Sequence, residues 1–198
     1  MNARNLHYIK KFNPKKAIRL ADNKYKTKRF LSQRDIPVPE TYALIRNRNE
    51  LYEFDFSKIP SDEFMIKPNK GSRGRGIKRV SLIDAPANPG IIPRLDVVNA
   101  LFSRQSNFPD QWYKMSGELV DDTSFRRYLM DILDGKNSLS TVHDQVLIEE
   151  VMLPGSGFEK FCTHGLADAR VIVFNLIPIV AYVRVPTAKS DGKANLAR

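Results

Sequence analysis

The most informative stretch of the chain is residues 64–76, which read Phe-Met-Ile-Lys-Pro-Asn-Lys-Gly-Ser-Arg-Gly-Arg-Gly. Three apolar residues followed by Lys67 and Pro68 are typical of a short strand, and another apolar stretch runs over residues 77–83. A strand, a glycine-rich turn and a second strand predict a hairpin with a flexible tip. The turn is therefore the first candidate for a ligand-binding segment.

The turn from Gly71 to Gly76 matches neither of two common phosphate-binding motifs. Gly76 is followed by Ile77 and Lys78 rather than by Lys-Ser or Lys-Thr, which excludes a Walker A loop. A dinucleotide-binding turn is excluded because a strand, not a helix, follows. Glycines still let backbone N–H groups approach an anion, and arginines add charge-assisted hydrogen bonds. Phosphate binding and a mobile tip without a ligand are both compatible with this composition.

Lys67 and the pair Glu149-Glu150 are charged residues within apolar strands. A lysine on the inner face of a strand needs an anionic partner, such as a phosphate group, whereas an outward lysine needs none. Adjacent acids in a strand point to opposite faces and cannot form a carboxylate dyad. We therefore expect one of the two glutamates to face a ligand cleft and the other to face solvent.

Three further charged residues lie in the apolar C-terminal third. Asp168 and Arg170 share a face only if the strand through Val171 begins as early as Asp168. Arg184 lies within a β-branched stretch, where an arginine binds either a ligand anion or a structural carboxylate. Cys162 and His164 supply too few ligands for a metal site, and the sequence order shows no nucleophile–histidine arrangement.

Patterning along the chain predicts mixed α and β structure. We expect a helix over 14–34 and a helix over 50–55 capped by Asn49. A third helix should be capped by Asp122, Thr123 or Ser124 and end at Gly135. Its apolar face is Phe125, Leu129, Ile132 and Leu133. Predicted strands cover 41–45, 64–67, 77–83, 146–152, 169–175 and 177–185, the last two joined by a tight turn at 175–178. Residues 84–123 have the pattern of an irregular insertion, within which residues 112–117 are compatible with a strand and a turn.

Composition indicates a globular protein of 198 residues with a basic N-terminal segment. Residues 1–34 carry eleven Lys and Arg against one acid, Asp22, whereas the rest has equal numbers of basic and acidic residues. The net charge of +10 therefore comes from this segment, which could meet a polyanion or form a solvated helix face. No apolar run approaches the roughly 20 residues of a membrane span. One cysteine and no apolar leader make the cytoplasm the simplest expected location.

Read together and in order, these segments resemble one family. The shared segments are Asp22-Asn-Lys-Tyr-Lys-Thr-Lys28, Ile36-Pro-Val-Pro39, Met65-Ile-Lys-Pro68, the glycine-rich turn, Leu147-Ile-Glu-Glu-Val151, Asp168-Ala-Arg170 and Ala194-Asn-Leu196. This order and spacing resemble the ATP-grasp superfamily, in particular its α-L-glutamate ligase-like branch, also described as sugar-transfer-associated ATP-grasp proteins. The resemblance spans nearly the whole chain. It implies an α+β fold in which two lobes hold ATP between them.

The resemblance also implies a role for each site residue. Lys24 and Lys67 would contact phosphates, and the loop with Gly71, Ser72, Arg73, Gly74 and Gly76 would close over them. Glu150 and Val151 would lie at the interlobe hinge and meet the adenine, Glu149 would also bind ATP, and Asp168 would lie near the ribose. Arg170, Arg184 and Asn195 would line the acyl-phosphate side. The implied domain organisation is a basic helical N-terminal segment over 1–34, a first lobe over 35–144 with the insertion 84–123, and the start of a second lobe over 145–198.

One feature departs from the family pattern. Members continue past the Asn-Leu segment into a Gly-Gly turn and then into an Asp and a Glu-x-Asn that bind Mg²⁺, so metal ligands are expected beyond Arg198. We therefore expect an incomplete second lobe, and only weak nucleotide binding without turnover by these 198 residues alone. Uncovered sheet edges would also favour a homo-oligomer.

Three functions remain open at this point. The first is an ATP- and Mg²⁺-dependent carboxylate–amine ligase, or its N-terminal portion, with both substrates unknown. The second is a non-catalytic ATP-grasp-like module that binds a nucleotide or a partner. The third is nucleic-acid binding through residues 1–34, which leaves Lys67 and the strand with Glu149-Glu150 unexplained and lacks interleaved aromatics.

Overall fold

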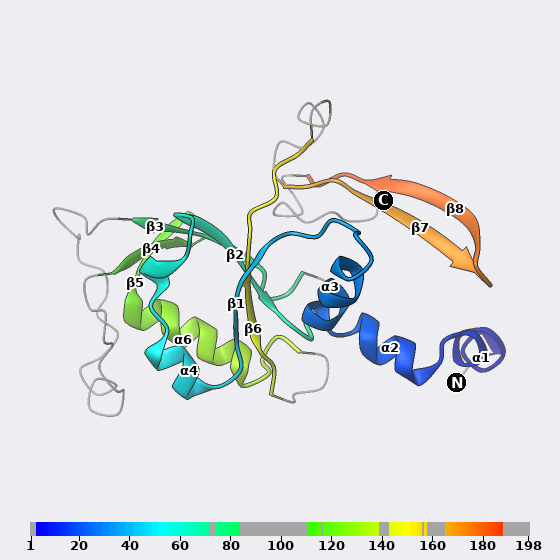
Figure 1. Ribbon diagram of the computed structural model, residues 1–198, viewed down its shortest axis with the longest axis horizontal. Coiled ribbons are helices and arrows are strands. Elements are labelled where there is room, and N and C mark those ends of the chain that lie inside the picture. Colours follow the sequence, from blue (N-terminus) through cyan, green and yellow to red (C-terminus); the bar gives the residue numbers. More distant parts are fainter. Residues whose placement is uncertain are drawn as a thin grey trace. The chain divides into compact units, whose positions relative to one another are not determined.

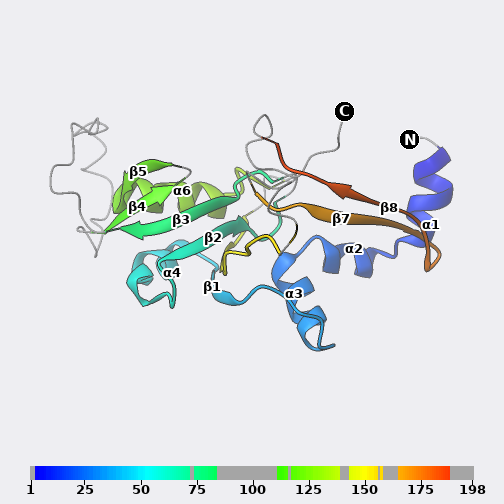
Figure 2. The ribbon, with the colours of Figure 1, turned by 90° about the horizontal axis from the view of Figure 1, so that it is seen from above.

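The computed structural model describes residues 3–71, 74–83, 111–115, 117–138, 143–155, 157 and 165–187, the side chains of 4–6 excepted (Figures 1 and 2). Contacts divide the chain into two units, residues 20–151 and residues 1–19 with 152–198. The lobe boundaries implied by the family resemblance stay a prediction.

Residues 20–151 contain a six-stranded, fully antiparallel sheet with the order β1-β6-β2-β3-β4-β5. Its strands are β1 Thr41–Ile45, β2 Glu63–Pro68, β3 Lys78–Ile83, β4 Trp112–Met115, β5 Glu118–Asp121 and β6 Val146–Glu149. The predicted hairpin is confirmed, since β2 pairs with β3 across the glycine-rich turn. β6 enters between β1 and β2 from far along the chain, which places two predicted site strands side by side.

One face of this sheet is covered by α4 Arg48–Glu53 and α6 Asp122–Leu133, and η2 Phe56–Lys58 adds to the same core (Figure 1). Strand alternation selects the residues involved: Phe64 and Ile66 of β2 are buried here, whereas Met65 and Lys67 point to the other face. The four apolar residues expected on α6 are all buried. The buried apolar core comprises Ile45, Leu51, Phe56, Ile59, Phe64, Ile66, Val80, Tyr113, Phe125, Leu129, Ile132, Leu133, Val146 and Ile148.

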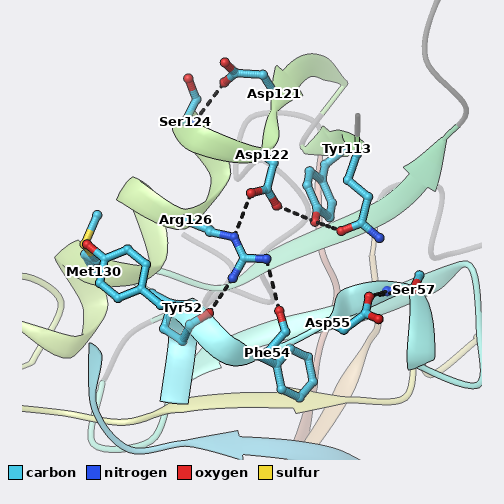
Figure 3. A network of polar contacts seen from close by, with 12 residues as sticks. Tyr52, Phe54, Asp55, Ser57, Tyr113, Asp121, Asp122, Ser124, Arg126 and Met130 are labelled. Atoms are coloured by element: carbon cyan, nitrogen blue, oxygen red, sulfur yellow. Dashed lines mark hydrogen bonds and ion pairs between the residues drawn. The ribbon is translucent and has the colours of Figure 1, made fainter. Parts of the chain in front are cut away.

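A buried arginine ties α6 to the end of α4 (Figure 3). Arg126 donates to Asp122 at 2.7 Å, to the Phe54 carbonyl at 3.0 Å and to the Leu51 carbonyl. Asp122 also accepts a hydrogen bond from the Tyr113 hydroxyl at 2.9 Å. The carbonyls of the last helical turn have no N–H partner within the helix to continue the pattern. Arg126 donates hydrogen bonds to two carbonyls at this end of α4. This network of hydrogen bonds links α6 to α4, the two helices that cover the core face of the sheet.

Several predicted boundaries shift in the structure. The expected single helix over 14–34 is two helices, α2 Lys15–Ala21 and α3 Lys24–Ser32, because Asn23 caps the second one through the Lys26 N–H at 2.8 Å. Asn47, not Asn49, caps α4, and Asp121 caps α6 one residue ahead of the expected residues. Gly135 follows α6 with φ 84°, as the predicted terminator requires.

Two predicted β segments also differ. β6 ends at Glu149 rather than continuing to Met152. Within the expected irregular insertion over 84–123, residues 112–115 and 118–121 form the β4–β5 hairpin at the sheet edge. Residues 84–110 lie outside the described part of the chain.

The other unit holds η1 Arg4–Ile9, α1 Lys10–Phe12 and the hairpin of β7 Asp168–Phe174 with β8 Ile177–Arg184. The predicted tight turn is confirmed: Asn175 and Leu176 have φ of 48° and 67°, as in a two-residue hairpin turn with both residues left-handed. Tyr8 and Phe12 pack against Phe174.

The β7–β8 hairpin exposes much of its apolar surface, with Ile177 and Ile179 each 62% exposed. Such a surface is compatible with self-association, which stays a prediction. Among the described residues, no helix is both long and apolar enough to cross a membrane.

Candidate functional site

The centre of the candidate site is an ion pair between Lys67 of β2 and Glu149 of β6. In the register of these strands Lys67 lies opposite Leu147 and Met65 lies opposite Glu149. Lys67 and Glu149 are therefore diagonal neighbours on the sheet face that α4 and α6 leave free. The Glu149 side chain is 3% exposed and that of Lys67 is 25% exposed. The structure thus gives Lys67 an anionic partner from within the chain.

Lys28 of α3 binds the other oxygen of the same carboxylate. Its Nζ lies 2.8 Å from Glu149 Oε2, whereas Lys67 contacts Oε1. The Lys28 side chain is 12% exposed. Lys28 was not among the residues that the sequence analysis selected. Its position four residues after Lys24, on the same face of a helix, is the signal that could have found it.

The first turn of α3 is fixed to the start of the glycine-rich loop through Asn69. The Lys24 N–H donates to the Asn69 carbonyl at 3.1 Å, and the Tyr25 N–H donates to Asn69 Oδ1 at 2.9 Å. These are N–H groups of a helix start, which need partners outside the helix. Asn69 itself is fully buried and bonds Gln145 twice, through its backbone N–H at 2.9 Å and its Nδ2 at 2.8 Å. The loop therefore leaves the sheet from a rigid base.

The Lys24 ammonium is bound to the same base. Its Nζ donates to the carbonyls of Pro68, Asn69 and Gly71 at 2.9, 3.4 and 2.5 Å. Burial lowers the pKa of Lys24, the nearby carboxylate of Asp144 opposes this shift, and the charge of Lys67 adds to it. In the structure Lys24 therefore holds the backbone on which the loop is built.

The predicted loop residues Gly71, Gly74 and Gly76 are described, whereas Ser72 and Arg73 lie outside the described residues. Gly76 has φ 68°, and a Cβ built on it would lie 2.8 Å from both Asn137 Nδ2 and Pro68 Cγ. Gly71 forms a bridge with Ser138, and a Cβ there would lie 2.8 Å from Pro68 Cβ. These two glycines permit close packing of the loop ends, a role distinct from approach to an anion.

Two further acids, Asp144 beside the loop and Glu150 after β6, bind backbone groups. Asp144, 2% exposed, accepts the Lys70 N–H with both oxygens, at 2.9 and 3.0 Å. Glu150 exchanges hydrogen bonds with the backbone of Glu40: its carboxylate accepts the Glu40 N–H at 2.9 Å, and its own N–H donates to the Glu40 carbonyl at 3.0 Å. Glu149 and Glu150 thus point to different partners. Val151 follows as a half-buried residue.

The remaining predicted residues belong to the unit with β7 and β8. The strand begins at Asp168, which satisfies the condition for Asp168 and Arg170 to share a face. Arg184 lies opposite Asp168 in the register and binds both of its oxygens, Oδ1 at 2.5 Å. This hydrogen bonding raises the pKa of Arg184. Arg170 is exposed opposite Tyr182, and Asn195 lies outside the described residues.

A pocket of about 240 Å³ lies beside Asp168 in the same unit. Its lining is mostly small and apolar, with Asp168 as its charged group; the lining residues are Pro154, Gly155, Leu166, Ala167, Asp168, Ala169 and Val183. Across the described parts of the chain, no group of three or more His, Cys, Asp or Glu side chains gathers to hold a metal ion.

Sequence reasoning missed Asn69, Asn137 and Asp144 in addition to Lys28. Each acts on the loop base through a contact between distant segments: Asn69 and Gln145 are 76 residues apart, and Lys70 and Asp144 are 74 apart. Local patterning gives no signal for such contacts. The tight approach of Asn137 to Gly76 also depends on where the turn after α6 meets the loop.

Comparison with known proteins gives one family match. The family model described as "Sugar-transfer associated ATP-grasp" matches residues 3–84 and 104–198, which is most of the chain. No curated protein and no solved structure matches the chain. The matched residues include β2, the start of the glycine-rich loop, β6 and the β7–β8 hairpin, which carry the site described above. The chain belongs to the sugar-transfer-associated ATP-grasp family.

Proposed function

We propose that the chain binds ATP and serves an ATP-dependent carboxylate–amine ligase reaction. Membership of an ATP-grasp family supports ligase-like use of ATP at a coarse level. The observation that carries the proposal is Lys67, a partly buried lysine at the base of a glycine-rich loop, with Lys28 beside it and Lys24 fixing the loop base. Several ammonium groups beside backbone N–H donors of a glycine-rich turn suit the oxygens of a polyphosphate.

In the proposed reaction a carboxylate takes the γ-phosphoryl group of ATP, and an amine then displaces phosphate from the acyl phosphate. Such chemistry rests on positioning and charge stabilisation and needs no protein nucleophile. Lys67 would hold phosphate oxygens while residues 71–76 cover them. Glu150 and Val151 would border the adenine, and Asp168 would border the ribose. Arg170, Arg184 and Asn195 would bind the acyl-phosphate side.

A divalent metal would neutralise charge on the phosphates of ATP. Mg²⁺ requires several oxygen ligands in near-octahedral geometry. Among the described residues, no cluster of three or more His, Cys, Asp or Glu side chains offers such a set. No step is therefore assigned to a metal on these residues. The two substrates are an unidentified carboxylate, for which glutamate is the first candidate to test, and an unidentified amine.

Calorimetric titration with Mg-ATP tests the proposal. We expect saturable binding that Lys67→Ala abolishes and that Lys58→Ala, a change at an 81% exposed lysine of the same unit, leaves unaltered. GTP, titrated under the same conditions, tests whether binding depends on the adenine base. Acyl-phosphate formation is then tested by trapping with hydroxylamine in the presence of glutamate. Absence of ATP binding would overturn the proposal, whereas binding without hydroxamate from any carboxylate offered would favour a non-catalytic nucleotide-binding module.

A further inference from the structure

The cluster of Lys28, Glu149 and Lys67 has more positive charge than its own pairing requires. One carboxylate, 3% exposed, is shared between two ammonium groups. Each lysine carries three N–H donors. Among the described residues, Lys28 and Lys67 each direct one recorded hydrogen bond to Glu149. The cluster therefore holds one uncompensated positive charge together with donors for a further anion.

Lys24 differs from these two lysines. Its ammonium has three recorded acceptors, all of them backbone carbonyls at the loop base. An ammonium so occupied has no donor left for a ligand unless it releases a carbonyl. Lys24 therefore acts on the site by fixing the loop, as a positioning residue, whereas Lys28 and Lys67 retain the capacity to bind.

We propose that Lys28 is a second phosphate-binding lysine beside Lys67, and that Glu149 is a resident counter-anion with which the phosphate oxygens of the nucleotide compete. This inference rests on the proposed function, since it concerns the same site. Neutralising a residue that simply contacts the ligand weakens binding. Neutralising a competing counter-anion has the opposite effect. Neutralising Glu149 should tighten polyphosphate binding, and neutralising Lys28 should weaken it.

The test titrates the full chain with inorganic tripolyphosphate and, separately, with ATP. We expect Lys28→Met to weaken tripolyphosphate binding about tenfold or more, as the loss of a charge-assisted hydrogen bond implies. Glu149→Gln should tighten it about tenfold, because both ammonium groups lose their competing partner. Lys26→Met, on the exposed side of the same helix, is the matched control and should change affinity less than about twofold.

A double variant guards against misfolding of the single lysine variant. Lys28→Met removes a partner of a buried carboxylate, and Lys28→Met with Glu149→Gln removes that charge as well. The double variant should lose the gain in affinity that Glu149→Gln alone produces. If it binds as tightly as Glu149→Gln alone, Lys28 takes no part and the inference is wrong. Weaker binding by Glu149→Gln than by the wild type would equally overturn the role of Glu149 as competitor.

The two ligands separate this inference from the proposed function. ATP binding by the wild type that Lys28→Met leaves unchanged would keep the function and reject the inference. Tripolyphosphate binding that depends on Lys28, without binding of ATP, would keep the anion site and reject the nucleotide function. Failure of the wild type to bind either ligand would reject both.

Discussion

Arg126 is a single buried residue that stabilises the unit carrying the Lys28–Glu149–Lys67 cluster. It is 3% exposed and serves Asp122 and two carbonyls at the end of α4. We expect Arg126→Met to lower the free energy of unfolding by roughly 3 kcal/mol, because it leaves a buried carboxylate and two carbonyls without this donor. Urea unfolding measures the change.

Two comparison variants make the Arg126 prediction specific. Lys136→Met disrupts an exposed pair with Asp131 and should change stability by less than about 0.5 kcal/mol. Adding Asp122→Asn to Arg126→Met should recover part of the loss, since the buried carboxylate that loses the Arg126 charge is then replaced by a neutral amide. A loss below about 1 kcal/mol for Arg126→Met would contradict the account.

Tyr128 predicts a pH dependence of stability. Its hydroxyl is buried without a hydrogen-bond partner among the described residues, and burial followed by the charge of Asp131 raises its pKa from 10 to about 12. Stability from this group is complete below pH 10 and is lost as pH rises toward 12, because the unfolded tyrosine ionises first. Tyr128→Phe should therefore flatten the alkaline decline in stability.

The same change should stabilise the protein at pH 7 by about 1 kcal/mol, because it removes an unsatisfied buried hydroxyl. Urea unfolding at pH 7, 10 and 11 gives both quantities. Tyr52→Phe is the matched control on a neighbouring helix; the Tyr52 hydroxyl donates to Met130 Sδ, so its removal should not stabilise. An unchanged slope above pH 10 in Tyr128→Phe would refute the assignment.

At the residue scale, sequence alone predicted that Lys67 and Glu149 matter but not that they meet. They are 82 residues apart, and their contact depends on β6 inserting between β1 and β2. A strand pattern gives alternation along one segment and carries no information on its neighbour or register. Lys24 illustrates the converse: its helix was predicted, but its carbonyl partners arise from packing of that helix on the loop base.

At the element scale, the glycine-rich loop is held by its ends. Gly76→Ala should undock the loop, because its φ of 68° disfavours a side chain and the new Cβ would meet Asn137 and Pro68. We expect a stability loss of about 1–2 kcal/mol and faster tryptic cleavage at Arg75. Gly155→Ala, where a Cβ meets nothing within 4 Å, is the control and should leave both unchanged. Equal cleavage rates in the two variants would argue against docking.

The β7–β8 hairpin offers a stabilising change. Leu176 is 94% exposed and sits at φ 67°, a conformation that costs a leucine about 1 kcal/mol and a glycine almost nothing. Leu176→Gly should therefore slow hydrogen exchange of the amides in β7 and β8. Ala181→Gly, an exposed position within β8, should speed it because strand glycine has greater entropy to lose. Faster exchange in Leu176→Gly would show that the leucine side chain stabilises the turn.

Element types were more predictable than element ends. β1 and the hairpin turn at 175–176 follow local rules of alternation and turn geometry, and the structure has them where the sequence placed them. The helix caps moved by one or two residues because several capping residue types stand close together, as at Asn47 and Asn49. Of the β4–β5 hairpin, the sequence indicated the first strand and the turn over 112–117, whereas β5 was missed because its four residues lie within a stretch without sustained periodicity.

At the scale of the whole molecule, the buried apolar core that the described residues form lies within one unit. Its members all lie between Ile45 and Ile148, whereas the described residues of β7 and β8 are mostly exposed. Apolar burial is the main stabilising term in folding, so the two units should differ in stability. Hydrogen exchange should therefore be slow in β2 and β6 and fast in β7 and β8.

This difference predicts that residues 20–151 fold when expressed alone, since they hold the six-stranded sheet, its covering helices and the Lys28–Glu149–Lys67 cluster. The fragment should unfold in urea in one cooperative transition at the concentration where β2 and β6 lose protection in the full chain. Arg126→Met should shift that transition equally in fragment and full chain, because Asp122, Leu51 and Phe54, to which Arg126 donates, lie inside the fragment. A fragment without a cooperative transition would show that the core needs the other unit, and a smaller shift in the full chain would show that the two units share stability.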